Sequence, residues 1–219
     1  MKHRLTAISM TSLFTVLTLL AVFSSGFCQV LNRVQPFGVS PTERQYRSVL
    51  NVTNGGKFGQ WKWDDTCPVN YFAIGFSLRV ESSQGIVDDT TLNGIRLHCA
   101  TENHQGFMYT VESHSGFWGD WTSPQYCPSG VLTAFQLQVG PHVGSSSDNT
   151  GANNIRFQCS SNPILEGAGM NWGEYGNWSD TCNSGGICGI KTKMQDRQGR
   201  GDDTALNDVH FHCCDRTSE

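Results

Sequence analysis

The sequence predicts an all-β protein built from three copies of one unit of about 55–60 residues. Three observations support this prediction. A short segment that reads aromatic–Gly–polar–Trp occurs three times, a stretch of alternating apolar residues follows each copy, and a polar turn with a cysteine-ending strand closes each copy. Long amphipathic helical patterns are not visible, and the 24 glycines and short apolar stretches are typical of sheets joined by turns.

The repeated aromatic segments mark the start of each unit. They are Phe58-Gly59-Gln60-Trp61, Trp118-Gly119-Asp120-Trp121 and Tyr175-Gly176-Asn177-Trp178. A cysteine follows each segment within a few residues, namely Cys67, Cys127 and Cys182. Trp61, Trp121 and Trp178 recur in every unit, whereas a single active site would break the threefold pattern. We therefore interpret these three tryptophans as packing residues that fill the core or its ends.

Alternating stretches predict the central strands. From Phe72 to Val80, apolar residues alternate with small or polar ones, and 135–139 and 190–194 show the same pattern. A period of two indicates a strand with one buried face and one solvated face. His98 and His212 occupy equivalent outward positions in the closing strands, where the second unit has Gln158, so we expect surface residues there and not metal ligands.

Each unit closes with a turn rich in Asp, Asn and Thr. The turns at 88–93, 148–153 and 202–207 lead to short strands that end at Cys99, Cys159 and Cys213, in that order. Such side chains cap their own backbone. We prefer this role to calcium binding, because the spacing and the closing glutamate of a calcium-binding loop are absent.

Three sheets that each have one solvated face must bury their other faces together. The simplest arrangement is a triangular prism with an apolar core on a pseudo-threefold axis, and a two-sheet sandwich is the alternative. We expect one domain over 47–214, with repeats at about 47–100, 107–160 and 163–214, and a C-terminal tail at 215–219.

The N-terminus predicts secretion. Lys2 and Arg4 precede an apolar run that is too short to span a bilayer, and small residues follow it. Cleavage after Gly26 or after Cys28 would leave a small residue at the cut. Removing Cys28 leaves eight of the nine cysteines, an even number, so we expect a signal peptide at 1–28 and a variable polar extension at 29–46.

The repeat restricts how the eight cysteines pair. If one pair is equivalent in each unit, the disulfides are Cys67–Cys99, Cys127–Cys159 and Cys182–Cys213, with Cys188–Cys214 as the fourth. The alternative pairing, Cys182–Cys214 with Cys188–Cys213, stays open. Disulfides suit an oxidising compartment, and the absence of a CxxC pair argues against zinc, so we expect no metal and no cofactor.

Several blocks of the sequence resemble the family of the outer-layer protein of the egg vitelline membrane. They are Asn54-Gly55-Gly56 with Trp61, Thr91 to Cys99, Asn153 to Phe157 and Gly201 to Asp208. The resemblance covers about 47–214. It implies a β-prism of three Greek-key antiparallel sheets with pseudo-threefold symmetry, an extracellular location, and a structural or matrix role with egg-coat glycoproteins as partners.

The same resemblance leaves two other functions open. A chitooligosaccharide transferase activity has been attached to the family, so the chain is either a non-enzymatic matrix protein or a weak transferase. A carbohydrate-binding prism is the remaining alternative, with oligosaccharides as partners. The formal net charge of −4, without a run of basic residues, argues against nucleic acid and against an anionic membrane surface.

Candidate site residues follow from these alternatives. Trp63, Trp118 and Trp172 fit the repeat less well than the other tryptophans, so they are the aromatic candidates for stacking on a sugar. Glycosyl transfer needs an acid and commonly a second carboxylate. Asp120 and Glu174 lie inside or beside the tryptophan segments and are the candidate catalytic pair.

Two sequons predict glycosylation. Asn51-Val52-Thr53 lies near the start of the domain, and Asn177-Trp178-Ser179 lies in the third aromatic segment. Asn177 shares its repeat position with Gln60 and Asp120, so we expect its side chain to be exposed, and either asparagine can accept glycan in a secreted protein.

Overall fold

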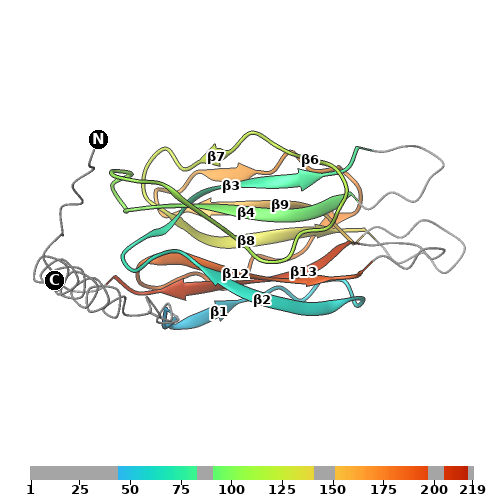
Figure 1. Cartoon of the computed structure of the whole chain (residues 1–219), viewed down its shortest axis with the longest axis horizontal. Coiled ribbons are helices and arrows are strands. Elements are labelled where there is room, and N and C mark those ends of the chain that lie inside the picture. Colours follow the sequence, from blue (N-terminus) through green and yellow to red (C-terminus); the bar gives the residue numbers. More distant parts are fainter. Residues whose placement is uncertain (1–43, 83–90, 141–150, 197–204, 217–219) are drawn as a thin grey trace, which may run out of the picture. The chain divides into compact units, whose positions relative to one another are not determined.

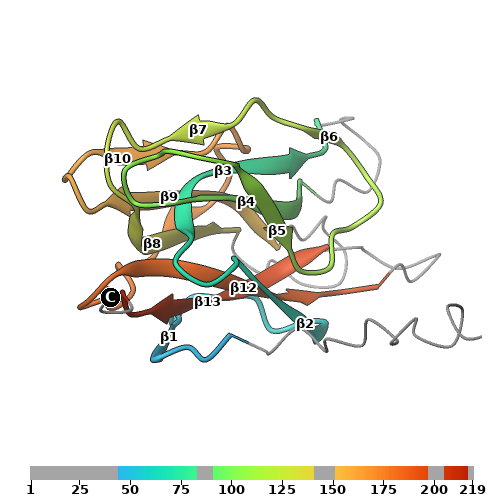
Figure 2. The same cartoon turned by 60° about the vertical axis from the view of Figure 1, so that its left-hand side comes forward.

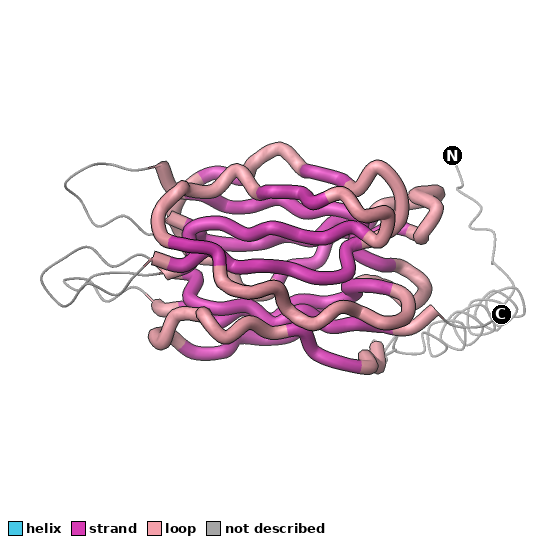
Figure 3. Tube along the Cα trace, turned by 180° about the vertical axis from the view of Figure 1, so that it is seen from behind, coloured by secondary structure: helices cyan, strands magenta, loops and turns pink. Residues whose placement is uncertain are grey.

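The computed structural model describes residues 44–82, 91–140, 151–196 and 205–216, all within one compact unit that spans Glu43–Glu219. The expected signal peptide, most of the expected extension and the first half of each Asp-rich turn lie outside these ranges. All the regular secondary structure within these ranges is β-strand (Figure 3). No helix in this described part of the chain is long and apolar enough to cross a membrane.

The strands form three antiparallel sheets, which we call sheets A, B and C (Figure 1). Sheet A has the order β1 (Ser48–Leu50), β13 (Leu206–Cys214), β12 (Gly186–Met194), β2 (Gln60–Thr66). Sheet B has the order β5 (Tyr109–Glu112), β4 (Leu92–Ala100), β3 (Phe72–Val80), β6 (Asp120–Trp121), and β7 (Gln125–Tyr126) also pairs with β3. Sheet C has the order β10 (Ile164–Glu166), β9 (Ala152–Cys159), β8 (Leu132–Val139), β11 (Glu174–Tyr175).

Every sheet is a Greek key. In sheet B, β3, β4 and β5 lie side by side in chain order, and β6 returns to pair with β3 on the other side. Sheet C repeats this arrangement with β8 to β11. Sheet A has the same arrangement in space, but its strands come from both ends of the domain. The C-terminal hairpin β12–β13 forms its centre, and the N-terminal strands β1 and β2 flank it (Figure 2). The expected Greek-key prism with pseudo-threefold symmetry is therefore confirmed.

The sheets do not coincide with the sequence repeats. Each sheet takes its central hairpin from one repeat and its edge strands from the next repeat along the chain, and sheet A closes the circle. An alternating strand therefore finds its hydrogen-bonding neighbours partly in another repeat. The three repeats interlock in one structure, and none of them forms a sheet alone.

Aromatic side chains from all three sheets meet in the core. Phe76 of sheet B lies with its ring centroid 4.7 Å from that of Phe157 in sheet C. The Phe157 ring is in turn 5.1 Å from Phe211 of sheet A, and Phe135 of sheet C is 4.8 Å from Phe211. All four rings are fully buried. The alternation that predicted one buried face per strand correctly assigned these residues to a shared core.

Three of the four disulfides connect successive sheets. They are Cys67–Cys99, Cys127–Cys159 and Cys182–Cys213. The first cysteine of each pair still hydrogen-bonds to one sheet through its backbone N–H, and the second lies in a strand of the next sheet. A covalent bond therefore links A to B, B to C and C to A.

The fourth disulfide, Cys188–Cys214, lies within sheet A. Of the two arrangements that the sequence left open for the last four cysteines, the structure has this one together with Cys182–Cys213. Cys188 is the extra residue of a β-bulge in β12, and Ile74 and Thr133 occupy the same bulge in β3 and β8. The chain thus repeats this bulge in all three sheets and carries a disulfide at only one of the three.

The outer faces of the sheets are less solvated than the alternation predicted. Seven of the nine residues of β3 are buried, and His98 and His212 are 8% and 2% exposed. The expectation of surface histidines is therefore wrong. Long side chains from the edge strands and loops cover these positions: Tyr126 contacts the ring of His98, and Tyr46 stacks on that of His212 at 4.2 Å.

Packing begins earlier in the chain than expected. Arg44, assigned to the extension, donates from Nη1 to the carbonyl oxygens of Cys67, Pro68 and Tyr71. Its guanidinium also lies 5.0 Å from the ring centroid of Phe72. Burial lowers the pKa of Arg44 below its usual value.

Candidate functional site

At one equivalent position on its outer face, each sheet carries an aromatic side chain that stacks on a residue of the central hairpin. The guanidinium carbon of Arg96 lies 4.0 Å from the ring centroid of Trp121 on sheet B, and that of Arg156 lies 3.9 Å from Tyr175 on sheet C. On sheet A, Trp61 stacks on His210 at 3.9 Å. The prediction that Trp61 and Trp121 fill the core or its ends is therefore wrong, because both rings lie outside the sheets.

This stacking also corrects the register of the third aromatic segment. Tyr175, and not Trp178, is the residue equivalent to Trp61 and Trp121. The segment equivalent to Trp118–Trp121 is therefore 172–175, three residues before the one that the sequence suggested. Gly59, Gly119 and Gly173 agree with this register, since all three have a positive φ of 77–83° and approach the end of a central strand in the same way.

A buried asparagine holds each aromatic segment in place. Asn93 and Asn207 accept from the backbone N–H of Trp118 and Phe58 through Oδ1, at 3.4 and 3.3 Å. Asn153 donates from Nδ2 to the carbonyl of Trp172 at 2.9 Å. These asparagines are at most 1% exposed. The end of one repeat therefore positions the start of the next.

The aromatic candidates from the sequence are exposed but do not form one cluster. Trp118 and Trp172, with Phe58, occupy equivalent positions at the edges of three different sheets. The reason for choosing Trp118 and Trp172, that they break the repeat, therefore fails. Trp63 is the more exposed candidate at 57%, and its ring contacts the edge of His114 at 5.2 Å.

The candidate catalytic carboxylates lie on different sheets. Asp120 pairs with Val80 in sheet B, and Glu174 pairs with Val139 in sheet C. They are repeat equivalents, with Gln60 as the third member of the set, and both are exposed. Neither is placed by an interaction with the other, so the geometry does not assemble them into an acid–nucleophile pair.

Sheet A departs from the threefold pattern in its charges. Arg96 and Arg156 form ion pairs with Glu112 and Glu166, both at 2.9 Å. The equivalent residue on sheet A is His210, whose pKa is lowered mainly by burial. On the same sheet, the Asp64 carboxylate accepts hydrogen bonds from His212 Nε2 and from Lys191 Nζ, each at 3.0 Å.

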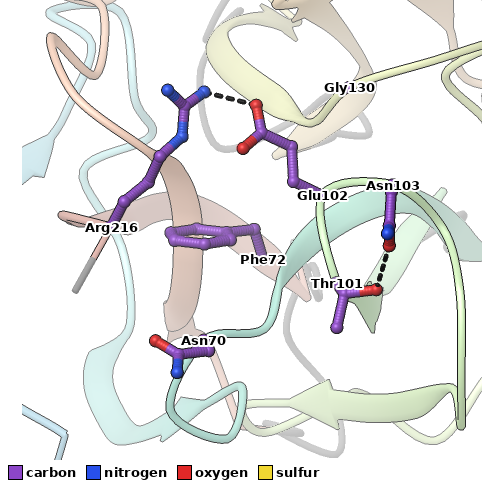
Figure 4. A pocket seen from close by; sticks show the side chains of 7 residues that line it. All are labelled: Asn70, Phe72, Thr101, Glu102, Asn103, Gly130 and Arg216. Atoms are coloured by element: carbon purple, nitrogen blue, oxygen red, sulfur yellow. Dashed lines mark hydrogen bonds and ion pairs between the residues drawn. The ribbon is translucent and has the colours of Figure 1, made fainter. Parts of the chain in front are cut away.

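An open pocket of about 630 Å³ lies at one end of the sheets (Figure 4). Residues from all three sheets or their flanking loops line it: Asn70, Phe72, Thr101, Glu102, Asn103, Gly130 and Arg216. In Figure 4 the Phe72 ring lies between the Arg216 and Thr101 sides of the pocket, and Arg216 forms an ion pair with Glu102. None of these residues was a candidate from the sequence.

The loop that forms one wall of the pocket is internally hydrogen-bonded. The Thr101 hydroxyl bonds Asn103 Oδ1 and the Gln105 carbonyl, both at 2.7 Å. His104, with a positive φ of 57°, bonds the Gly130 carbonyl through Nε2 at 2.6 Å. Hydrogen bonds therefore hold the wall against the start of sheet C before a ligand arrives.

Metal binding finds no support in the described ranges, where no three His, Cys, Asp or Glu side chains gather as a metal site requires. Both sequon asparagines, Asn51 and Asn177, are exposed. Ser179 of the second sequon is buried, and its hydroxyl accepts from the Phe135 N–H. Asn51 follows β1 at the edge of sheet A.

Comparisons with known proteins agree with the repeat pattern. The family model for vitelline membrane outer layer protein I (VOMI) matches residues 48–216. The chain is 49% identical over 201 residues to the vitelline membrane outer layer protein 1 homolog of Mus musculus, covering 91% of this chain and 95% of that protein. It is 52% identical over 171 residues to the Homo sapiens homolog, covering 77% and 84%.

Two solved lectins show a partial structural likeness. Artocarpin in complex with mannopentose is 13% identical, with a TM-score of 0.49, and covers 77% of this chain and 97% of the lectin. Calsepa lectin in complex with a biantennary N-glycan is 13% identical, with a TM-score of 0.47 and the same coverage. A likeness at this level establishes no shared ligand. The match over 48–216 and the identity to both homologs are decisive, and the chain belongs to the vitelline membrane outer layer protein I family.

Proposed function

We propose that this chain is a secreted, non-enzymatic structural protein of an extracellular coat or fluid. The observation that carries the proposal is the set of three disulfides that link each sheet to the next. Such bonds persist in oxidising compartments and are rare in the cytosol. Disulfides between all three pairs of sheets suit a protein that must stay folded for a long time outside the cell, without chaperones and without resynthesis.

The position of the candidate catalytic residues favours this reading over a transferase. Asp120 and Glu174 are equivalent residues on two sheets, and a threefold scaffold repeats surface features as readily as it repeats core residues. Incubation with chitooligosaccharides, read by mass spectrometry, tests the transferase. Longer products that disappear in an Asp120→Asn, Glu174→Gln double variant would replace the structural proposal with an enzymatic one.

Secretion is the direct test of the structural proposal. The full chain is expressed in animal cells, and the medium is examined by intact mass and by non-reducing peptide mapping. We expect a mature protein that begins after Gly26 or Cys28, carries glycan at Asn51 or Asn177, and contains four disulfides. Retention inside the cell, or a secreted form with a free thiol at any of the eight cysteines from Cys67 to Cys214, would contradict the proposal.

Matrix association is the second part of that test. Secreted protein is mixed with isolated egg-coat or mucosal matrix and sedimented. Co-sedimentation that saturates, and that resists moderate salt, is expected for a structural component whose outer faces bind neighbours through aromatic contacts. Full recovery in the supernatant would contradict a matrix role.

Carbohydrate binding is a second candidate function. Exposed aromatic rings favour it, because an aromatic face stacks on the apolar face of a pyranose, and Trp63, Trp118 and Trp172 all have exposed side chains. A glycan array with the secreted protein tests it. Saturable binding to defined sugars would support the candidate, and an empty array would exclude it.

A further inference from the structure

The end pocket is a place where the pseudo-threefold symmetry is broken. The three central hairpins begin with Phe72, Val131 and Gly186 at equivalent positions, as their register to the paired strands shows. These are a large aromatic, a medium aliphatic and a residue without a side chain. A threefold scaffold can hold one unique site only where equivalent positions differ, and outside the buried core the three sheets converge at their ends.

The floor of the pocket lies on a closely packed apolar cluster. Phe72 belongs to a small buried cluster that is separate from the main core. The other members of this cluster are Ile74, Ala100, Val131, Cys188 and Cys214. The Cys188–Cys214 disulfide therefore lies beneath the pocket, and Gly185 is so close to Phe72 that a side chain there would collide with the ring. Close packing therefore fixes the ring, and because Phe72 is only 3% exposed, little of it is open to a ligand.

The charges in the pocket lining are paired. Glu102 and Arg216 form an ion pair, with side chains 42% and 57% exposed. Their charges cancel, and the remaining polar side chains are the hydroxyl of Thr101 and the amides of Asn70 and Asn103. A charged ligand would have to compete with the ion pair. A neutral ligand that both donates and accepts hydrogen bonds can bond to Glu102 and to Arg216 without breaking their ion pair.

A sugar ring has these properties. Its hydroxyl groups both donate and accept hydrogen bonds, as the Glu102–Arg216 pair and the amides of the lining require. The pocket volume of about 630 Å³ lies within the usual range of small-molecule sites, roughly 300–1,000 Å³. An arginine has five N–H donors, so the ion pair leaves donors of Arg216 for a ligand.

Aromatic residues continue from the rim of the pocket along sheet B. The wall loop that ends at Gln105 leads directly to Phe107, Met108 and Tyr109, and all three side chains are exposed. Tyr109 contacts Tyr71 edge-on, with centroids 5.0 Å apart, and Tyr71 follows the pocket residue Asn70 in the chain. A second sugar ring that leaves the pocket on this side would meet an aromatic surface.

We propose that the end pocket binds the terminal ring of a neutral oligosaccharide, and that the next ring stacks on Phe107. The hydrogen bonds come from Arg216, Glu102 and the Thr101–Asn103 wall, and the apolar contact comes from the exposed ring of Phe107. The proposal rests on the second candidate function, carbohydrate binding, and assigns it to a site other than Trp63, Trp118 and Trp172.

The test begins with a glycan array that contains neutral and sialylated oligosaccharides. The neutral oligosaccharide with the strongest signal is then titrated by calorimetry into the secreted protein and into Glu102→Gln and Arg216→Gln. Each variant has a matched control that breaks the exposed Arg47–Asp215 pair outside the pocket lining, namely Asp215→Asn and Arg47→Gln. We expect the pocket variants to weaken binding about tenfold and the controls to leave it unchanged.

A second pair of variants tests the rim. Phe107 and Phe117 are both highly exposed, at 81% and 72%, but they lie near opposite ends of sheet B. Phe107→Ala should weaken the binding of a disaccharide or longer sugar while leaving the affinity for a monosaccharide unchanged, and Phe117→Ala should change neither. Unfolding temperatures within the spread of the wild type show that the variants are folded.

The possible outcomes separate the two proposals. An empty array excludes carbohydrate binding and the pocket proposal together. Binding that is lost in Trp63→Ala, Trp118→Ala or Trp172→Ala, and that is unchanged in Glu102→Gln and Arg216→Gln, keeps the function and overturns the pocket assignment. Binding of sialylated glycans alone overturns the neutral ligand class.

Discussion

The guanidinium of Arg96 stacks on the ring of Trp121 at 4.0 Å, across the outer face of sheet B, and donates from Nε to Glu112 at 2.9 Å. Glu112 lies on the strand at the opposite edge of the sheet from Trp121. One arginine therefore connects both edge strands to the central hairpin. Sheet C has the same arrangement, with Tyr175, Arg156 and Glu166.

We expect the stack to contribute measurable coupling. In a double-mutant cycle with Arg96→Ala and Trp121→Ala, the free energies of unfolding should be non-additive by about 0.5–1 kcal/mol, since a partly exposed cation–π contact is worth this much. Urea unfolding of the wild type, both single variants and the double variant provides the measurement. Additive effects would mean that the two side chains cover the sheet independently.

Asp208 makes the stability depend on pH in an unusual direction. Burial raises the pKa of this carboxyl to about 6, from an ordinary value of 3.8, although the Val209 N–H and Lys193 act in the opposite sense. The folded state therefore holds a proton that the unfolded state loses between pH 4 and 6. The stability that this proton contributes is complete below pH 4 and is lost as the pH rises through 6.

The second repeat suggests how to remove this dependence. Asn154 is the residue equivalent to Asp208, and both accept from the N–H of the following residue, at 2.9 and 2.8 Å. Asp208→Asn should raise the free energy of unfolding at pH 8 by about 1–2 kcal/mol, a discounted value because the carboxyl is only partly buried. At pH 4 the variant and the wild type should be equal. Urea titrations at both pH values check this, and equal stabilities at pH 8 would show that the carboxylate is not strained.

The buried asparagines should be costly to remove. Asn207→Ala deletes the group that accepts from the Phe58 N–H in the interior, and we expect a loss of about 1–3 kcal/mol. Asn183→Ala, at an exposed position, is the matched control and should change the stability by less than about 0.5 kcal/mol. Thermal unfolding of the two variants distinguishes them. Similar melting temperatures would mean that the segment before β2 is held by other contacts.

The disulfides should differ in importance although their loops are similar in length. Cys67–Cys99 and Cys188–Cys214 close 32 and 26 residues, and the chain-entropy contribution of each is about 3.5 kcal/mol. Sheet B has Ile74 and Ala100 where sheet A has Cys188 and Cys214. A Cys188→Ile, Cys214→Ala variant should therefore lose less stability than Cys67→Ala, Cys99→Ala, which disconnects sheet A from sheet B.

Calorimetric melting of both double variants, with fully reduced protein as a reference, measures this difference. Full reduction should lower the melting temperature sharply. If the two double variants melt together, loop closure alone accounts for the disulfides, and the connection between sheets adds nothing.

Much of the fold could be predicted because it depends on the spacing of residues that are close together in the sequence. The alternation from Phe72 to Val80 and the cysteine after each closing strand were enough to expect three sheets around one core. The exchange of edge strands could not be predicted in this way. It depends on which repeat supplies the neighbour of β3, and residues within β3 do not encode that choice.

The third aromatic segment shows where pattern matching fails. Trp178 lies at the end of a matching tetrapeptide, but the segment that holds the equivalent place ends in Tyr175. A tyrosine satisfies the same physical requirement, an aromatic face over Arg156. The signal that could have found it is the glycine, since Gly173 has the left-handed φ that Gly59 and Gly119 share.

The end pocket could not be predicted from the sequence, for a different reason. Its residues come from four separate segments, around Asn70, Thr101, Gly130 and Arg216, and none of them belongs to a motif. Only the convergence of three sheet ends brings them together. The tryptophans that attracted attention in the sequence instead lie on separate sheets.

Sheet A is completed by the first and the last described strands of the chain, β1 at Ser48–Leu50 and β13 at Leu206–Cys214. During translation, the residues of sheets B and C emerge from the ribosome before this pairing can occur. The nascent polypeptide must therefore carry β1 and β2 without their sheet neighbours until β12 and β13 have been synthesised.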